Sequence, residues 1–345
     1  MFSQLRNLVL AILTVSVIFP GLIYADSVED GWAVAFENDI LAGGSRDKDF
    51  TYGLSLTWYG DSSEKYLSPL YLQNHLDSFV GFNTEQEGKP GAASLEIGLY
   101  GFTPEDISQS ETIEDDRPYA SLVYVSSTRS RVNQHAQSVV SSSLSIGILG
   151  FDWVGDAQNS LHAALDGKKA QGWNRQISDG GELTAKYRIA RQKYLPTRVS
   201  GFELKSTRQF SLGYISELSY SLGFRAGVVR SPWWTFDPEF TLYGEKPLPT
   251  TVNNRHKENY FWGGVSLKAR FYNAFLQGQF RHSDHTYKSD ELNPILLEAW
   301  AGYTFSFGDG FSLSYLLRAH SAEIKHGQGE RNLVWGGLVV SRELI

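Results

Sequence analysis

Five polar residues in the first half of the chain have side chains that could take part in ester hydrolysis. An amide and an acid stand together at Asn38 and Asp39, a hydroxyl follows at Thr51, and an amide and an imidazole stand four residues apart at Gln158 and His162. Histidine is the usual general base at neutral pH. Carboxylate and amide oxygens suit a hard cation such as Ca²⁺, which takes six to eight oxygen ligands. Such a cation polarises an ester carbonyl while the histidine takes a proton from the attacking water.

The sequence lacks the motifs that several other kinds of chemistry require, so we exclude those kinds of chemistry. It has no Gly-x-Ser-x-Gly elbow, no His-Glu-x-x-His zinc motif and no glycine-rich phosphate loop. It has no cysteine, so neither a disulfide framework nor a thiolate site is possible. Its net charge of −7 offers no basic surface for nucleic acid. The acid, amide, hydroxyl and imidazole set therefore remains as the candidate chemistry.

The first 25 residues have the pattern of a secretory signal peptide. Arg6 is their only charged residue, residues 8–18 are apolar, and Ala25 stands where a small residue precedes cleavage. The apolar stretch is short for a membrane-spanning helix, which needs about 20 apolar residues, so a membrane anchor is the weaker alternative. We therefore divide the chain into a signal peptide, residues 1–25, and a single domain, residues 26–345.

Short runs of alternating apolar and polar residues recur throughout residues 26–345. Residues 142–148, Ser-Ser-Leu-Ser-Ile-Gly-Ile, have one apolar face and one small polar face. No later segment has 18 consecutive apolar residues. Together with the signal peptide, these features predict an all-β fold: a closed antiparallel transmembrane β-barrel of the bacterial outer membrane. A soluble β-sandwich or a small lipocalin-like barrel is the alternative.

The number of strands follows from a parity rule. Thirteen segments fit a strand, but single-chain bacterial barrels have even counts, so we assign the most polar segment, 274–284, to a loop. The twelve predicted strands are 32–38, 51–59, 93–101, 118–129, 139–149, 182–191, 203–213, 217–229, 260–272, 295–306, 311–322 and 331–341.

The candidate residues fall at the ends of neighbouring predicted strands. If the N-terminus is periplasmic, odd strands end and even strands begin at the outer rim, so Asn38, Asp39 and Thr51 share that rim. Residues 157–166 form the one convincing helical stretch, which Asp156 can cap and which Gly167 can end. Spacings of three and four residues put Gln158 and His162 on one face of this helix. We expect the helix at the same rim.

Two further acids, Asp47 and Asp49, stand between the first two predicted strands. Acids between strands are ordinary turn residues, so we interpret this pair as part of a solvated loop.

Five motifs, taken in order, resemble those of the outer-membrane lipid A 3′-O-deacylase family. The resemblance covers nearly all of residues 26–345. The motifs are Phe36-Glu37-Asn38-Asp39, Asp49-Phe50-Thr51-Tyr52-Gly53, Phe102-Thr103-Pro104, Asp116-Arg117-Pro118-Tyr119-Ala120, and Gln158-Asn159 with His162 and Gly172-Trp173-x-x-Gln176.

The resemblance implies a twelve-stranded barrel that uses Ca²⁺ and removes the 3′-linked acyloxyacyl chain from lipid A. It implies that His162 is the general base and that Asn38 and Asp39 lie at the metal and reaction centre. It also implies that Thr51 and Gln158 are needed beside them.

The chain departs from the family pattern at two positions near the site. An acidic residue six positions after the family histidine is replaced by Lys168, and the more important departure concerns a lysine. The family has a lysine between the Phe-Thr-Pro turn and the Asp-Arg motif, whereas residues 104–116 here contain none. Two alternatives follow: either an arginine, foremost Arg117, supplies positive charge near the oxyanion or a substrate phosphate instead, or the activity differs from that of the family.

These observations predict a monomeric outer-membrane hydrolase that acts on the acyl esters of lipid A in lipopolysaccharide. One alternative is a different lipid esterase or phospholipase on the same scaffold. The other is a non-catalytic barrel whose acidic rim holds Ca²⁺ between lipopolysaccharide headgroups.

Overall fold

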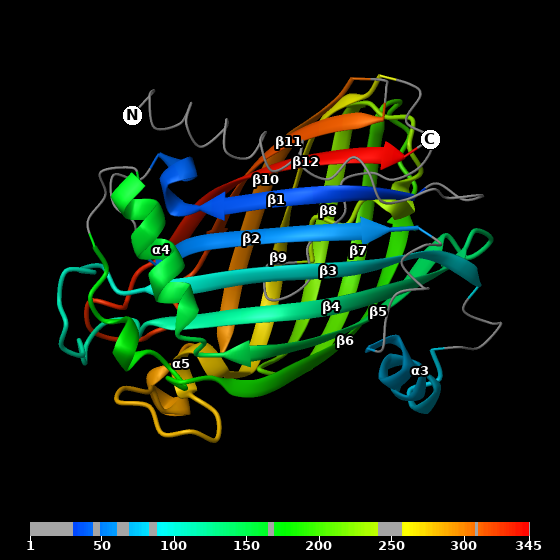
Figure 1. Cartoon of the computed structure of the whole chain (residues 1–345). Coiled ribbons are helices and arrows are strands. Elements are labelled where there is room, and N and C mark those ends of the chain that lie inside the picture. Colours follow the sequence, from blue (N-terminus) through cyan, green and yellow to red (C-terminus); the bar gives the residue numbers. More distant parts are fainter. Residues whose placement is uncertain are drawn as a thin grey trace.

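Twelve antiparallel strands form a closed barrel in the computed structural model (Figure 1). The structure describes residues 30–43, 49–60, 69–82, 88–164, 169–240, 257–307 and 310–344, so the predicted signal peptide, Asp47 and Gly167 lie outside the described residues. Each strand pairs with its sequence neighbours, and β1 pairs with β12 to close the barrel. The strands are β1 Asp30–Asn38, β2 Asp49–Tyr59, β3 Lys89–Thr103, β4 Ala120–Asn133, β5 Ser138–Leu149, β6 Glu182–Leu195, β7 Phe202–Gly213, β8 Ile215–Val228, β9 Asn259–Asn273, β10 Ile295–Ser306, β11 Phe311–His320 and β12 Leu333–Leu344.

The prediction of a twelve-stranded barrel is confirmed, and each predicted strand overlaps one observed strand. Segment 274–284 is not a strand: it begins with the short helix α5, Ala274–Gln277, and continues as a loop. The alternation that predicted the strands also separates the two faces of the wall. In β11, Leu313 and Leu317 are exposed on the outer face, whereas Ser312 and Ser314 are buried inside.

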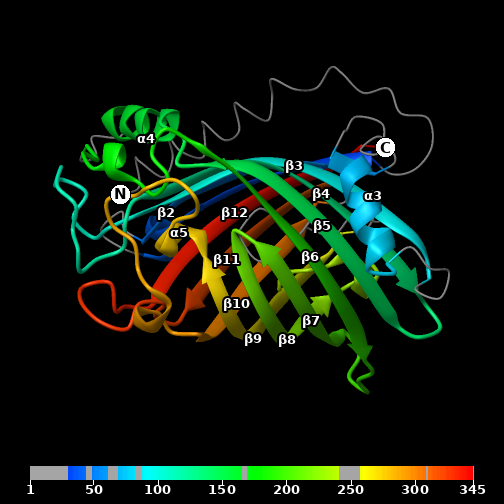
Figure 2. The same ribbon diagram turned by 90° about the horizontal axis from the view of Figure 1, so that it is seen from below.

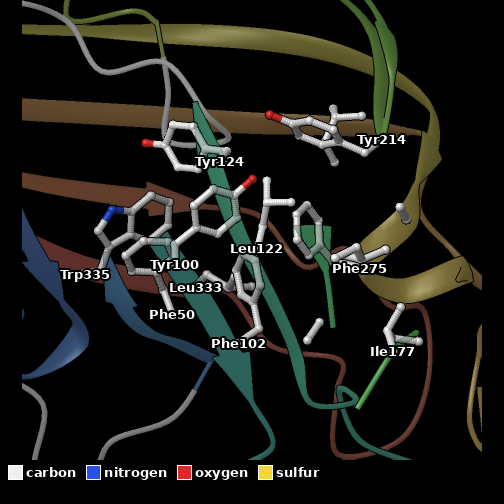
Figure 3. Close-up of a cluster of buried hydrophobic side chains, with 14 residues drawn as sticks. Phe50, Tyr100, Phe102, Leu122, Tyr124, Ile177, Tyr214, Phe275, Leu333 and Trp335 are labelled. Atoms are coloured by element: carbon white, nitrogen blue, oxygen red, sulfur yellow. The ribbon is translucent and has the colours of Figure 1, made fainter. Parts of the chain in front are cut away.

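Side chains fill the barrel interior near the end at which β1 finishes. A cluster of buried aromatic and aliphatic residues packs there, and α5 adds Phe275 to it (Figure 3). The Phe275 ring lies 5.3 Å from that of Tyr100 and 5.4 Å from that of Phe102, measured between centroids. At the opposite end, residues 229–240, which follow β8, fold inward and pack Phe236 against Trp262, with ring centroids 5.4 Å apart. Both ends of the interior are therefore packed with side chains.

Two longer helices lie outside the ring of strands at opposite ends of the barrel (Figures 1 and 2). Helix α4, Trp153–Ala164, follows β5, as predicted, but begins earlier than expected. Asp156 therefore stands in the first turn of the helix and is not its cap. Helix α3, Pro69–Phe79, connects β2 to β3 and was not predicted. Within the described residues, neither helix is long and apolar enough to cross a membrane.

Candidate functional site

Asn38 joins the end of β1 to the beginning of β2. Its side-chain oxygen accepts a hydrogen bond of 2.7 Å from the backbone N–H of Ile40 and so caps the 3-10 helix η1, Asp39–Ala42. Its side-chain nitrogen donates to the backbone carbonyl of Thr51. Because side chains alternate along β1, Asn38 is on the same outer face as Trp32, whose ring packs edge-on against Phe311. The hydrogen bond from Asn38 to the carbonyl of Thr51 puts two of the predicted site residues in direct contact.

A β-bulge places Thr51. The pairing of β2 with β3 shifts between Phe50 and Tyr52, so Thr51 has no directly opposed partner on β3. Its hydroxyl lies 2.6 Å from that of Thr103, and both threonines are fully buried. Bulges redirect side chains and are common beside functional sites. This bulge lets Phe50 join the interior core while Tyr52 lies on the outer face with Leu54.

The η1 helix folds back onto the outer surface of the wall. The hydroxyl of Tyr315 donates a hydrogen bond of 2.6 Å to the carbonyl of Leu41. Gly336 of β12 permits this approach, because a Cβ atom at that position would lie 2.7 Å from backbone atoms of Leu41. The polar turn after β1 is therefore placed on the outer surface of the barrel.

Helix α4 packs on the same outer surface, over β2 to β4. Val154 of the helix, Tyr52 and Tyr119 form a buried cluster with Trp173, which belongs to the 3-10 helix η3, Trp173–Arg175. The Trp173 ring centroid lies 5.0 Å from that of Tyr119 and 6.3 Å from that of Tyr52. Gly155 allows the close contact, because a Cβ there would lie 2.6 Å from the Trp173 ring. The cluster attaches α4 to the wall.

The segment that carries Trp173 is tied to the wall on its far side. The hydroxyl of Ser121 donates to the side-chain oxygen of Gln176 at 2.8 Å, and the backbone N–H of Ile177 donates to the carbonyl of Tyr119 at 2.8 Å. Gln176 in turn donates to Asp179 at 3.4 Å, and burial raises the pKa of Asp179 above its ordinary value despite this hydrogen bond. The motif Gly-Trp-x-x-Gln is therefore an anchor for α4.

Gln158 and His162 lie one turn apart on α4. Gln158 is buried, and its side-chain oxygen accepts a hydrogen bond of 2.6 Å from the indole nitrogen of Trp173. The backbone of His162 belongs to the helix, but its side chain is outside the part of the chain whose side chains are described. Contacts link Asn38 to Thr51, the adjacent Tyr52 to Trp173, and Trp173 to Gln158. The helix that carries His162 is therefore brought to the same surface as the residues of β1 and β2.

The described residues match a calcium site only in part. Asp39 is buried at the beginning of η1 and provides a hard carboxylate ligand, whereas the side-chain oxygen of Asn38 already accepts the capping hydrogen bond. Among the described residues, no group of three or more histidine, cysteine or acidic side chains could hold a metal ion. Asp47, the nearest further acid in sequence, lies outside the described residues. Of the two predicted ligands, Asp39 is therefore the better placed.

Arg117 lies with the interior core and not with the residues on the outer face. Its guanidinium pairs with Glu323, stands 4.9 Å from the ring centroid of Phe102, and has its Nε 3.9 Å from a carboxylate oxygen of Asp49. Only 2% of its side chain is exposed. The prediction that Arg117 contacts substrate therefore has no support from its position, which instead makes it a partner of buried acids.

Asp49 is not part of a solvated loop, so that interpretation was wrong. It is buried, and Arg331 donates to it from Nε at 2.9 Å. Arg331 also donates to Asp116 at 2.6 Å and so joins the turn before β2 to the segment before β4. Sequence reasoning missed Arg331 and Glu323, because both stand between β11 and β12 and no local motif marks them.

The fold and the site together define an outer-membrane β-barrel with a set of polar residues on its outer surface. A family model described as outer membrane protein LpxR matches residues 8–344. The chain belongs to this family, and the family assignment made from the motifs is confirmed. It is accordingly a protein of the outer membrane.

One solved structure agrees with the fold, and two others are less similar. LpxR from Salmonella typhimurium is 16% identical, with 90% of this chain and 99% of that chain covered and a TM-score of 0.68. An outer membrane channel from Pseudomonas putida F1 is 9% identical over 94% of this chain and 99% of that chain, with a TM-score of 0.44. The β domain of the Bordetella autotransporter BrkA is 9% identical over 92% and 99%, with a TM-score of 0.42. No curated protein sequence matches the chain.

Proposed function

We propose that this protein hydrolyses an ester-linked acyl chain of lipid A, the 3′-linked chain by its family resemblance, on the outer surface of the barrel between η1 and α4. The observation that carries the proposal is the placement of the polar set. Asn38 is on the outer face of the wall, and Gln158 and His162 are on a helix packed against that face. A lipid substrate in the membrane meets this face directly.

An apolar row on the wall leads toward these residues. It runs straight across five strands through register partners, and all its members face outward: Leu54, Leu99, Val123, Ile148 and Leu183. Leu54, Ile148 and Leu183 are exposed, whereas Leu99 and Val123 support the cluster beneath α4. An acyl chain lying on the exposed members of this row buries apolar surface and brings its ester to the polar edge of the wall.

The roles of the residues follow from the chemistry of ester hydrolysis. His162 takes a proton from water as the water oxygen attacks the ester carbon, and then returns a proton to the departing sugar oxygen. Gln158 lies on the same face of α4 as His162, and its hydrogen bond from Trp173 holds that face of the helix against the wall. Asn38, which bonds the backbone of Thr51, holds in place the turn that carries Asp39. The products are a free fatty acid and lipid A with one new hydroxyl group.

Calcium belongs to this proposal as a cofactor held by Asp39, with further oxygens from Asn38, backbone carbonyls or the substrate. When bound, such an ion supplies positive charge that stabilises the developing oxyanion. Arg117 forms ion pairs with the buried carboxylates of Asp49 and Glu323, so we assign it no contact with substrate.

The test is deacylation of purified lipid A by protein folded in detergent, followed by mass spectrometry. We expect lipid A to lose the mass of its 3′-linked chain with wild-type protein and not with His162→Ala. A phospholipid incubated in parallel tests the alternative of a different lipid esterase. Absence of turnover with both substrates, at any calcium concentration, would favour the non-catalytic barrel.

A further inference from the structure

Helix α3 lies on the outer surface of the wall, at the end of the barrel away from α4 (Figure 2). It contacts β4 and β5, and it hydrogen-bonds residues whose side chains point outward. Ser142 is on the same face of β5 as the exposed Ile148, and Tyr187 is on the same face of β6 as the exposed Leu183. The helix therefore covers part of the surface that would otherwise face lipid.

Two polar side chains of α3 make hydrogen bonds to the wall. The amide nitrogen of Gln73 donates to the hydroxyl of Ser142 at 2.9 Å, and the Gln73 oxygen accepts from the hydroxyl of Ser127 at 2.6 Å. One turn later, Asp77 accepts from the hydroxyl of Tyr187 at 2.8 Å. Gln73 and Asp77 are completely buried. The two residues form one polar face that is sealed against the barrel.

The wall beneath α3 differs from the outer face elsewhere. Outward positions of β7, β9 and β10 carry exposed leucines, namely Leu212, Leu267 and Leu297. Under α3 the outward positions include Ser127 and Ser142, which are at most 1% exposed. Hydroxyl groups facing hydrocarbon without partners are costly, and α3 provides those partners.

The other side of α3 carries exposed apolar side chains. Phe79 is 89% exposed and Leu72 is 49% exposed. A helix on the surface of a soluble protein has the opposite arrangement, with its apolar face packed on the protein and its polar face in water. Leu72 and Phe79 share this side with the exposed His75 and Ser78. Two large apolar side chains exposed on a helix that covers part of the outer wall are suited to lipid.

We propose that α3 is a membrane-contacting helix, and that phospholipid acyl chains at that end of the barrel pack against Leu72 and Phe79. We choose lipid as the partner because α3 covers outward-facing side chains of β4 to β6. Its own outward side is therefore continuous with the outer surface of the barrel, which lipid surrounds. The proposal does not depend on catalysis and holds for the non-catalytic alternative as well.

The test uses single-cysteine variants. Because the chain has no cysteine of its own, a thiol-reactive label modifies only the introduced residue. Phe79→Cys is labelled with an environment-sensitive fluorophore, folded, and reconstituted into phosphatidylethanolamine and phosphatidylglycerol vesicles that contain lipids spin-labelled along the acyl chain. Leu212→Cys, on the exposed wall, is the lipid-facing control. Gln134→Cys, in the exposed turn between β4 and β5, is the water-facing control.

We expect the Phe79 label to be quenched by the acyl-chain spin labels about threefold more than the Gln134 label, and to approach the Leu212 label. Leu72→Cys repeats the measurement from a second position, and heat-modifiable migration on gels shows that each variant is folded. Quenching at both α3 positions equal to that of the Gln134 label would overturn the proposal. So would protection from both lipid-borne and aqueous quenchers, because that result indicates a protein partner or a second copy of the chain.

Discussion

Arg331 holds Asp49 from the other end of the sequence. Its Nε donates to one carboxylate oxygen at 2.9 Å, and its Nη2 lies 2.7 Å from the other. Asp49 has a φ of +62°, a left-handed conformation that non-glycine residues rarely adopt. It begins β2 immediately before the bulge at Thr51. The ion pair therefore stabilises the backbone that aims Thr51.

Arg331→Gln is expected to lower the rate of deacylation by about tenfold, because Asp49 relaxes and the bulge at Thr51 shifts by a fraction of an ångström. The measurement is kcat and KM with detergent-folded protein, and the loss should fall mainly on kcat. Arg208→Gln removes the same charge from an exposed position on β7 and should leave both constants unchanged. Equal activity of the two variants would show that the pair has no influence on the site.

Asp49→Gly and Asp49→Ala separate the charge of Asp49 from its conformation. Both remove the carboxylate, but only glycine adopts a positive φ without strain, whereas a left-handed alanine costs about 1–2 kcal/mol. We expect Asp49→Ala to be less stable to urea and less active than Asp49→Gly. If the two variants behaved alike, the left-handed conformation would contribute nothing measurable.

His162→Ala is expected to reduce ester cleavage by about 10²–10⁴-fold, the usual effect of losing a general base. The barrel should still migrate as a folded, heat-modifiable species, because a single side chain on α4 contributes little to a wall of twelve paired strands. Asn159→Ala is not a suitable control, because Asn159 bonds the backbone of Ala170. Ser160→Ala, at an exposed position of the same helix, is the matched control. A folded His162→Ala protein with full activity would assign the histidine a structural role.

Trp173→Phe tests whether the anchor of α4 matters through its hydrogen bond. A smaller aromatic ring remains in the cluster, and the buried oxygen of Gln158 loses its donor at a cost of about 1–3 kcal/mol. We expect activity to fall and protease sensitivity of α4 to rise. Trp153→Phe changes an exposed indole on the same helix and should do neither. Unchanged proteolysis and turnover in Trp173→Phe would separate this hydrogen bond from the site.

Calcium dependence is expected to act through Asp39. Chelator should abolish turnover, Ca²⁺ should restore it, and Mg²⁺ should restore it poorly because it requires a tighter octahedral shell. Asp39→Asn keeps the size of the side chain but removes its charge, so it should raise the Ca²⁺ concentration needed for half-maximal activity, and Asp39→Ala should raise it further. Isothermal titration with Ca²⁺ gives a readout that does not depend on turnover. Full activity in excess chelator would remove the metal from the mechanism.

The strands and their shared rim could be predicted from the sequence because the signals are local. Alternation of side chains is visible within each strand, as in residues 142–148 of β5, and strand parity then places Asn38 and Thr51 at one end of the barrel. The spacing of Gln158 and His162 likewise follows from helical periodicity alone.

Relationships between distant segments were decided only by the tertiary structure. An acid in a short turn is usually solvated. No residue near Asp49 in the sequence indicates that Arg331, 282 residues away, pairs with it and buries it. The amphipathic pattern of α3 defines two faces, but the serines of β4 and β5 decide which face meets the protein. The sequence by itself determined which residues could form a site, because periodicity and parity are properties of neighbouring residues. Only the closed barrel decided that α4 and Asn38 meet on the outside of the wall, because that choice depends on packing between segments that no local pattern connects.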